Sequence, residues 1–189
     1  MIQLIVGVGN PGPDYAATRH NVAWLLMDHG AFSSALWKSK FKGLYAESNF
    51  KGKKFYGLKP QTYMNLSGES VQPMAAFFKI EPSQILVVHD EVDLPFGQIH
   101  FKMGGGLAGH NGLKSIAACL GTNEFPRLRI GVGKPVHGSM ADWVLGRFSK
   151  DEQIQLPLLF DKITDPMLTT VVEGITKVAN TYNKKNLLS

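Results

Sequence analysis

Apolar residues occur along the chain in short runs that alternate with longer segments of helical periodicity. The runs have the length of buried strands and cover Gln3 to Val8, Ile85 to His89, Ile99 to Met103 and Leu128 to Val132. Apolar positions three and four residues apart predict helices at Val22 to Phe32, Leu66 to Phe78, Asn111 to Leu120 and Pro166 to Tyr182. Pro166 suits a first helical turn. Strands separated by helices predict an α/β protein with a layered sheet.

A lysine-rich segment in the first third of the chain predicts a β-hairpin. The stretches LYAESNF and KFYGLKP have strand character and flank a KGKK turn. Between Lys38 and Lys59 there are seven lysines and one acid, Glu47. Lysines of this kind protect the edge of a sheet from pairing with another chain. A hairpin in the middle of an α/β pattern predicts that the sheet is mixed.

Composition and charge narrow the class of protein. With 189 residues, 44% of them hydrophobic and 19% charged, the chain is typical of one globular domain. No apolar run approaches the roughly 20 residues of a membrane span, and the first residues lack the basic region of a signal peptide. Cys119 is the only cysteine, so we expect no internal disulfide and a cytoplasmic protein. The net charge of +5 permits a polyanionic partner without requiring one.

A glycine pattern near the amino terminus matches the dinucleotide-binding motif G-x-G-x-x-G, with its members at Gly7, Gly9 and Gly12. Pro11 and Pro13 flank the last glycine, and each removes a backbone N–H that a pyrophosphate needs. The motif also requires an acid at a strand end about 20 residues later, whereas Asp28 lies in a predicted helix. We therefore expect no nucleotide here, and instead a rigid turn that presents Asn10 and Tyr15 to a cleft.

Polar residues gather after predicted strands and in loops that lead into helices. Such positions lie at one edge of an open α/β sheet, where sites form. The candidate residues are Asn10, Tyr15 and His20 in the first segment, Met64 and Asn65 in KPQTYMNLSG, Asp90, Glu91 and Asp93 in VVHDEVDLPFG, and His110 and Asn111 after a glycine-rich turn.

These candidates permit more than one function. His89, Asp90, Glu91 and Asp93 have residue types that bind metal ions, which would indicate a metal-dependent hydrolase. The basic charge permits a non-catalytic RNA-binding module. A metal-independent hydrolase is the third interpretation.

Seven motifs in a fixed order favour the third interpretation. They are GVGNPG, Y-x-x-T-R-H-N, KP-x-T-Y-M-N-x-S-G, HDE-x-D-L-P-x-G, GHNGLKSI, F-x-R-L-R-I-G-V-G and VLGRF. In this order, from about Leu4 to Phe148, the chain resembles the bacterial-type peptidyl-tRNA hydrolase family. The resemblance implies a three-layer α/β/α sandwich around a mixed, twisted sheet. It also implies one domain over residues 1–189, with a helical segment from about residue 150 packed on the sheet.

The resemblance also implies an activity. The family cleaves the ester that joins a peptide to the 3′-terminal ribose of tRNA, without a cofactor or metal ion. By resemblance, His20 is the general base, Asp93 is the carboxylate that orients it, and Asn10 helps to place the water. The expected substrate-binding residues are Tyr15, Met64, Asn65, His110 and Asn111.

For the tRNA, the resemblance points to Lys102 and Arg129 as phosphate-binding residues, in a monomeric enzyme. The chain departs from the family after Gly138, where members usually carry a further basic residue and this chain has none as far as Val144. Lys134 is the candidate to compensate. A second departure is Ala108, where the family usually has glycine, and we expect a slightly stiffer loop there.

Overall fold

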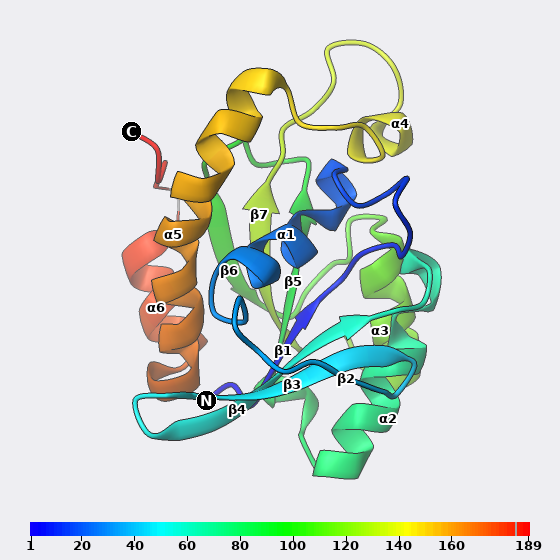
Figure 1. Cartoon of the computed structure of the whole chain (residues 1–189), viewed down its shortest axis with the longest axis vertical. Helices are drawn as coiled ribbons and strands as arrows, with labels where there is room; N and C mark the ends of the chain where they lie inside the picture. The colour runs from blue at the N-terminus through cyan, green and yellow to red at the C-terminus, as the bar shows by residue number, and fades with distance from the viewer. Residues whose placement is uncertain (184) are drawn as a thin grey trace.

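A seven-stranded mixed sheet runs through the centre of the protein, which a computed structural model describes for residues 1–183 and 185–189 (Figure 1). The strands lie in the order β2-β3-β4-β1-β5-β7-β6. Their bounds are β1 Leu4–Gly7, β2 Lys38–Lys40, β3 Gly43–Phe50, β4 Lys53–Pro60, β5 Ile85–Glu91, β6 Ile99–Met103 and β7 Pro126–Gly131. β4, β1, β5 and β7 are parallel, while β2, β3 and β6 pair in antiparallel fashion. The expected mixed sheet is confirmed.

Helices cover both faces of this sheet. Their bounds are α1 Val22–His29, α2 Gly68–Phe78, α3 Asn111–Leu120, α4 Met140–Val144, α5 Lys150–Glu173 and α6 Ile175–Tyr182, with 3₁₀ turns η1 Arg19–Asn21, η2 Met64–Leu66 and η3 Pro82–Gln84. Figure 1 shows α5 and α6 on one side of the sheet and α2 and α3 on the other. Strand alternation explains the two layers, because Ile5 packs toward α1 and α5 while its neighbours Leu4 and Val6 pack toward α2 and α3. The expected three-layer sandwich is confirmed.

Most element boundaries agree with the sequence prediction, and the carboxyl-terminal helix does not. α5 begins at Lys150, sixteen residues before the predicted start, because Ser149 and Glu152 form a capping box there. Pro166 therefore lies inside α5 and not in a first turn. Gly174, with a φ of +78°, separates α5 from α6. β2 and α4 are additional short elements that the pattern did not predict.

The two edges of the sheet are protected in different ways. On the β2 edge, Lys38 and Lys40 are exposed, as expected of lysines that discourage edge pairing. At β6, the amide of Asn183 accepts a hydrogen bond from Phe101 N at 2.7 Å and donates one to Phe101 O at 2.9 Å. That side chain thus takes the place of a neighbouring strand. Among the described residues, no helix combines the length and apolar character needed to cross a bilayer.

Candidate active site

A cleft of about 410 Å³ opens where the parallel strands β1 and β5 end. It is lined by Asn10, His20, Met64, Asn65, Asp90, Glu91, Val92, Ala108, Gly109, His110, Asn111, Met140, Ala141, Val144 and Leu145. Eight of the candidate residues from the sequence therefore meet in one cavity: Asn10, His20, Met64, Asn65, Asp90, Glu91, His110 and Asn111. Tyr15 lies outside this lining and packs edge-on against Tyr63, with ring centroids 6.4 Å apart.

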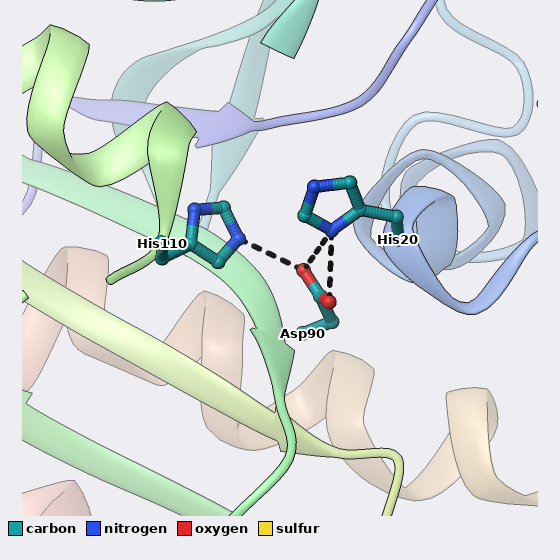
Figure 2. A group of neighbouring side chains, drawn as sticks. All are labelled: His20, Asp90 and His110. Carbon is teal, nitrogen blue, oxygen red and sulfur yellow. Dashed lines mark hydrogen bonds and ion pairs between the residues drawn. The ribbon is translucent and has the colours of Figure 1, made fainter. Parts of the chain in front are cut away.

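A buried carboxylate joins two imidazoles at the base of the cleft. Figure 2 shows His20 and His110 on either side of Asp90. His20 Nδ1 lies 2.9 Å from each carboxylate oxygen of Asp90, and His110 Nε2 lies 2.9 Å from Oδ1. The Asp90 side chain is 2% exposed, so the charge that it carries interacts with its neighbours with little screening by water.

Hydrogen-bond partners fix which nitrogen of each imidazole carries the proton. His110 caps α3, and its Nδ1 accepts hydrogen bonds from Gly112 N at 3.1 Å and Leu113 N at 3.3 Å. A neutral imidazole that accepts at Nδ1 carries its proton on Nε2, which then donates to Asp90. His20 faces Asp90 through Nδ1, so its proton lies there and Nε2 is the basic nitrogen.

Opposing effects set the charge of Asp90. Burial acts to raise the pKa of Asp90, but His110 and then His20 outweigh this effect and hold the pKa well below its usual range. The adjacent His89 is fully buried, and its Nδ1 donates to Asp90 O at 2.8 Å. Burial, with repulsion from His110, lowers the pKa of His89 to about 3. Asp90 is therefore ionised and His89 neutral near pH 7.

The expectation that Asp93 lies against His20 is wrong, and Asp90 takes that place. Asp93 follows the end of β5, its side chain is 52% exposed, and it pairs with Lys134 at 2.6 Å. The hydrogen bond from Lys134 lowers the pKa of Asp93. Strand alternation explains why Asp90 faces His20. Asp90 and Val88 lie on the same face of β5, and Val88 packs against the hydrophobic cluster that contains α1. His20 lies in η1, the turn that leads into α1.

The four residues considered for a metal ion do not converge. His89 bonds to a backbone carbonyl, Glu91 pairs with Arg129 at 2.9 Å, and Asp93 pairs with Lys134. Among the described residues, the group whose ligand atoms do lie within 4.8 Å of one another is His20, Asp90 and His110. In that group, each contact with Asp90 is already a hydrogen bond from an imidazole.

Reciprocal amide contacts hold Asn10 in the cleft. Asn10 N donates to Asn21 Oδ1 and Asn21 Nδ2 donates to Asn10 O, both at 2.9 Å. Asn10 Oδ1 accepts from Met64 N at 2.6 Å, which ties the first loop to η2. The preceding glycines serve close packing: a Cβ at Gly9 would lie 2.6 Å from the ring of Trp24 in α1. The glycine pattern thus shapes the turn that presents Asn10.

A smaller basic cavity of about 270 Å³ adjoins the cleft and shares Glu91 and Ala108 with it. Lys102 and Arg129 line it, as does Arg127, which the sequence reasoning did not single out. The Arg127 guanidinium donates to the carbonyls of Gly104 and Gly106 and so holds the glycine-rich loop. Arg127 and Arg129 are two positions apart in β7, and side chains with this spacing lie on the same face of a strand. This spacing is the feature of the sequence from which Arg127 could have been predicted.

Two features of the surrounding loops bear on the departures from the family pattern. Ala108 has a φ of +49°, a left-handed conformation that costs a non-glycine residue roughly 1 kcal/mol. Lys134 is absent from the lining of the basic cavity, and its ammonium pairs with Asp93. The opposite wall of the cleft comes from α4 and Leu145, which the sequence pattern did not predict as part of the site.

Comparisons with known proteins identify the family of this chain. A family model described as Peptidyl-tRNA hydrolase matches residues 4–188. A protein of Geotalea daltonii named peptidyl-tRNA hydrolase is 43% identical over 99% of each chain. One of Geobacter metallireducens with the same name is 44% identical over 98% of this chain and 97% of its own. The crystal structure of peptidyl-tRNA hydrolase from Acinetobacter baumannii is similar, with a TM-score of 0.89 and 37% identity over 98% of this chain and 96% of that one. The chain belongs to the peptidyl-tRNA hydrolase family.

Proposed function

We propose that this protein hydrolyses the ester between a peptide, or an N-blocked amino acid, and the 3′-terminal ribose of tRNA. The reaction releases free tRNA and so recycles peptidyl-tRNA that left translation prematurely. The observation that carries the proposal is the imidazole of His20, which lines the cleft and is held through Nδ1 by the buried carboxylate of Asp90. Membership of the family supports the substrate class.

In the proposed reaction, His20 Nε2 removes a proton from water as the oxygen attacks the ester carbonyl. The charge of Asp90 stabilises the imidazolium that forms and keeps the imidazole in the orientation set by Nδ1. The tetrahedral intermediate collapses, the C–O bond to the ribose breaks, and the imidazolium returns its proton to the 3′ oxygen. An ester is already reactive toward water, so the reaction needs no covalent intermediate on the protein.

The neutral amides of the cleft suit substrate binding. Asn10, Asn65 and Asn111 each offer a donor and an acceptor without adding charge, as a peptide backbone and a water molecule require. Met64 supplies an apolar contact in the same lining. Tyr15, which packs against Tyr63 outside this lining, remains a proposed substrate-binding residue. His110 acts on His20 through Asp90 in this proposal.

The basic cavity suits a phosphate of the acceptor arm. Lys102 and Arg129 carry the positive charge, and Glu91 orients Arg129 through a contact of 2.9 Å. Lys134 remains a candidate for a further phosphate, in competition with its contact to Asp93. We further propose that the enzyme is monomeric and acts in the cytoplasm, where peptidyl-tRNA arises.

A single-turnover assay on N-acetylated aminoacyl-tRNA tests the proposal. We expect wild-type protein to release the tRNA, and His20→Ala to lose about 10² to 10⁴ in rate with tRNA affinity unchanged. His29→Ala is the matched control, because His29 is the last residue of α1, pairs with Asp161 and lies outside the cleft lining, so this variant should keep full activity. Retention of more than about a tenth of the rate in His20→Ala would exclude a general base.

Two additions to the assay separate the remaining alternatives. Activity that survives thorough chelation would exclude a metal-dependent hydrolase, whereas loss on chelation and recovery with a divalent ion would favour the group His20, Asp90 and His110 as ligands. Aminoacyl-tRNA with a free amino group should be spared, because burying an unpaired ammonium among neutral amides costs several kcal/mol. A protein that binds tRNA and cleaves neither substrate would be an RNA-binding module.

A further inference from the structure

Arg19 lies next to His20 in η1, yet its side chain reaches toward α4 on the other wall of the cleft. The Arg19 guanidinium stacks on the ring of Trp143, with Cζ 3.6 Å from the ring centroid. Its Nη1 donates to Trp143 O at 3.3 Å, and its backbone N–H donates to Gly146 O at 3.0 Å. One buried arginine therefore contacts α4 through a ring, a carbonyl and the following turn.

α4 has little of its own to keep it in place. It spans five residues, none of them buried, and it lies beyond the end of the sheet (Figure 1). A helix this short has no intrinsic stability in water, so tertiary contacts must hold it. Besides the contacts with Arg19, Trp143 Nε1 donates to Val132 O at 3.3 Å. Met140 and Val144 of this helix line the cleft.

The other side of the guanidinium is tied to the start of α5. Arg19 Nη2 lies 3.5 Å from Glu152 Oε2, and the same oxygen accepts a hydrogen bond from Ser149 N at 2.8 Å. Glu152 belongs to the capping box of α5, a long helix packed on the sheet. The stack on Trp143 is thus anchored to a rigid part of the fold, and a lysine could not reproduce its planar geometry.

We propose that Arg19 is a positioning residue, which fixes the apolar wall of the cleft formed by α4 and Leu145 relative to His20. Because Arg19 and His20 are consecutive residues of one turn, the distance between this wall and the catalytic imidazole is set within η1. The wall offers Met140, Val144 and Leu145 to an apolar group of the substrate. This consequence for substrate binding rests on the function proposed above, whereas the positioning of α4 does not.

Hydrogen exchange tests the positioning directly and needs no substrate. We expect Arg19→Ala and Trp143→Ala each to raise exchange at residues 140–147 by roughly tenfold, with the central strands unchanged. The double variant should raise exchange by clearly less than the product of the two single effects, because both single variants remove the same stack of the guanidinium on the indole. Arg19→Lys should lie between wild type and Arg19→Ala. Arg147→Ala is the matched control, since Arg147 is an exposed arginine of the same segment.

Unchanged exchange in Arg19→Ala and Trp143→Ala, or additive effects in the double variant, would overturn the proposal. If Arg19→Ala fails to fold, Arg19→Lys and Trp143→Ala still decide the outcome, because the proposal requires both to loosen the same segment. Faster exchange throughout the sheet would show that Arg19 only stabilises the fold.

The kinetic consequence is measured with a minimal substrate, an N-acylated amino acid esterified to one nucleoside, which lacks the tRNA phosphates. We expect Arg19→Ala to raise KM roughly tenfold with kcat within about threefold of wild type, and Arg147→Ala to change neither. A loss confined to kcat would mean that Arg19 acts through His20 and not through the wall. If wild-type protein cleaves no ester and residues 140–147 still loosen as described, the proposed function fails and the positioning role stands.

Discussion

Asp90 and Asp93 lie three positions apart in one acidic segment and meet opposite surroundings. Asp90 is the sixth residue of β5, is buried, and contacts two imidazoles. Asp93 follows the strand, is half exposed, and contacts one lysine. Partners lower the pKa of both carboxyl groups, although burial opposes the effect strongly at Asp90. The comparison teaches that an acid within the last residues of a strand is held in the buried site, whereas an acid just after the strand is exposed to water. Only the buried carboxylate is placed to stabilise a charge on a catalytic imidazole.

The energetic meaning of the two pairs also differs. An exposed ion pair such as Asp93 with Lys134 contributes about 0–1 kcal/mol, because water screens both charges. A buried carboxylate has no such screening, so the removal of a partner leaves an uncompensated charge or an unsatisfied donor. We therefore expect changes at Asp90 to have larger effects than changes at Asp93.

The largest expected effect is that of Asp90→Asn. The amide removes the charge that stabilises the His20 imidazolium and offers an N–H where the imidazole needs an acceptor. We expect kcat to fall by roughly 10²- to 10⁴-fold, with little change in KM. Steady-state kinetics on N-acetylated aminoacyl-tRNA measure this loss, and thermal unfolding checks that the variant is folded. A variant that keeps most of its kcat would contradict the role of Asp90.

A second prediction concerns stability at acid pH and the neighbour of Asp90. His89 has a pKa of about 3 in the folded protein, and an unfolded histidine has a pKa of about 6.5. Between these values the unfolded chain binds more protons, so the free energy of unfolding falls as the pH decreases, by up to about 1.4 kcal/mol per pH unit. The Asp90 contribution is present above about pH 4 and is lost below it, because its folded pKa is depressed.

Urea unfolding of wild type and His89→Gln at pH 7, 6, 5, 4 and 3 separates these contributions. Above pH 4, His89→Gln should flatten the dependence of the free energy of unfolding on pH. The steeper loss below about pH 4, which comes from Asp90, should persist in this variant. Parallel curves for the two proteins between pH 6 and pH 4 would contradict the buried, neutral state of His89.

Next in size is the effect of His110, which has two separable contacts. Its Nε2 donates to Asp90 and its Nδ1 caps α3. His110→Ala should lower the free energy of unfolding by about 1 kcal/mol, because it removes the cap of α3. It should also lower kcat roughly tenfold, because it removes the hydrogen-bond donor to Asp90. His110→Asn retains a capping oxygen, so it should recover most of the stability without recovering kcat. Recovery of both would mean that His110 serves only as a cap.

Asp93→Asn should have the smallest effect, with kcat within about threefold of wild type. The substitution also releases Lys134, which sharpens the question of whether this lysine binds a phosphate. If it does, Lys134→Ala should flatten the plot of log K against log salt by roughly 0.7 to 0.9 units for tRNA, and Asp93→Asn should not. Equal slopes for wild type and Lys134→Ala would remove Lys134 from the tRNA interface.

The comparison also shows how far the sequence alone predicts the site. The motifs identify the segments that meet in the cleft, and His20, Asn10 and Asn65 are placed in it as expected. The resemblance pointed to Asp93 and not to Asp90. A motif identifies the acidic segment, whereas the contact with His20 depends on which residue of that segment still lies within the strand. Alternation along β5 is a signal in the sequence that favours Asp90, provided that the end of the strand is known.

For the fold, the longer periodic elements were predictable and the short ones were not. The bounds predicted for β6 and α3 agree with the structure to the residue. α4 and β2 have too few residues for a periodic pattern, and α4 depends on Arg19, more than 120 positions away in the chain. The start of α5 was predictable from Ser149 and Glu152, but Pro166 is a more conspicuous and misleading signal.

The 3₁₀ form of η1 has a consequence for how this enzyme tolerates change. Three residues complete one turn of such a helix, so successive side chains point about 120° apart. Arg19 faces α4, His20 faces Asp90, and Asn21 faces Asn10. The order of these three residues therefore determines which partner each side chain contacts. Exchange of His20 with Asn21 would conserve composition, charge and helix length, but the imidazole would then face Asn10 and not Asp90. A single inserted residue would misdirect all three side chains.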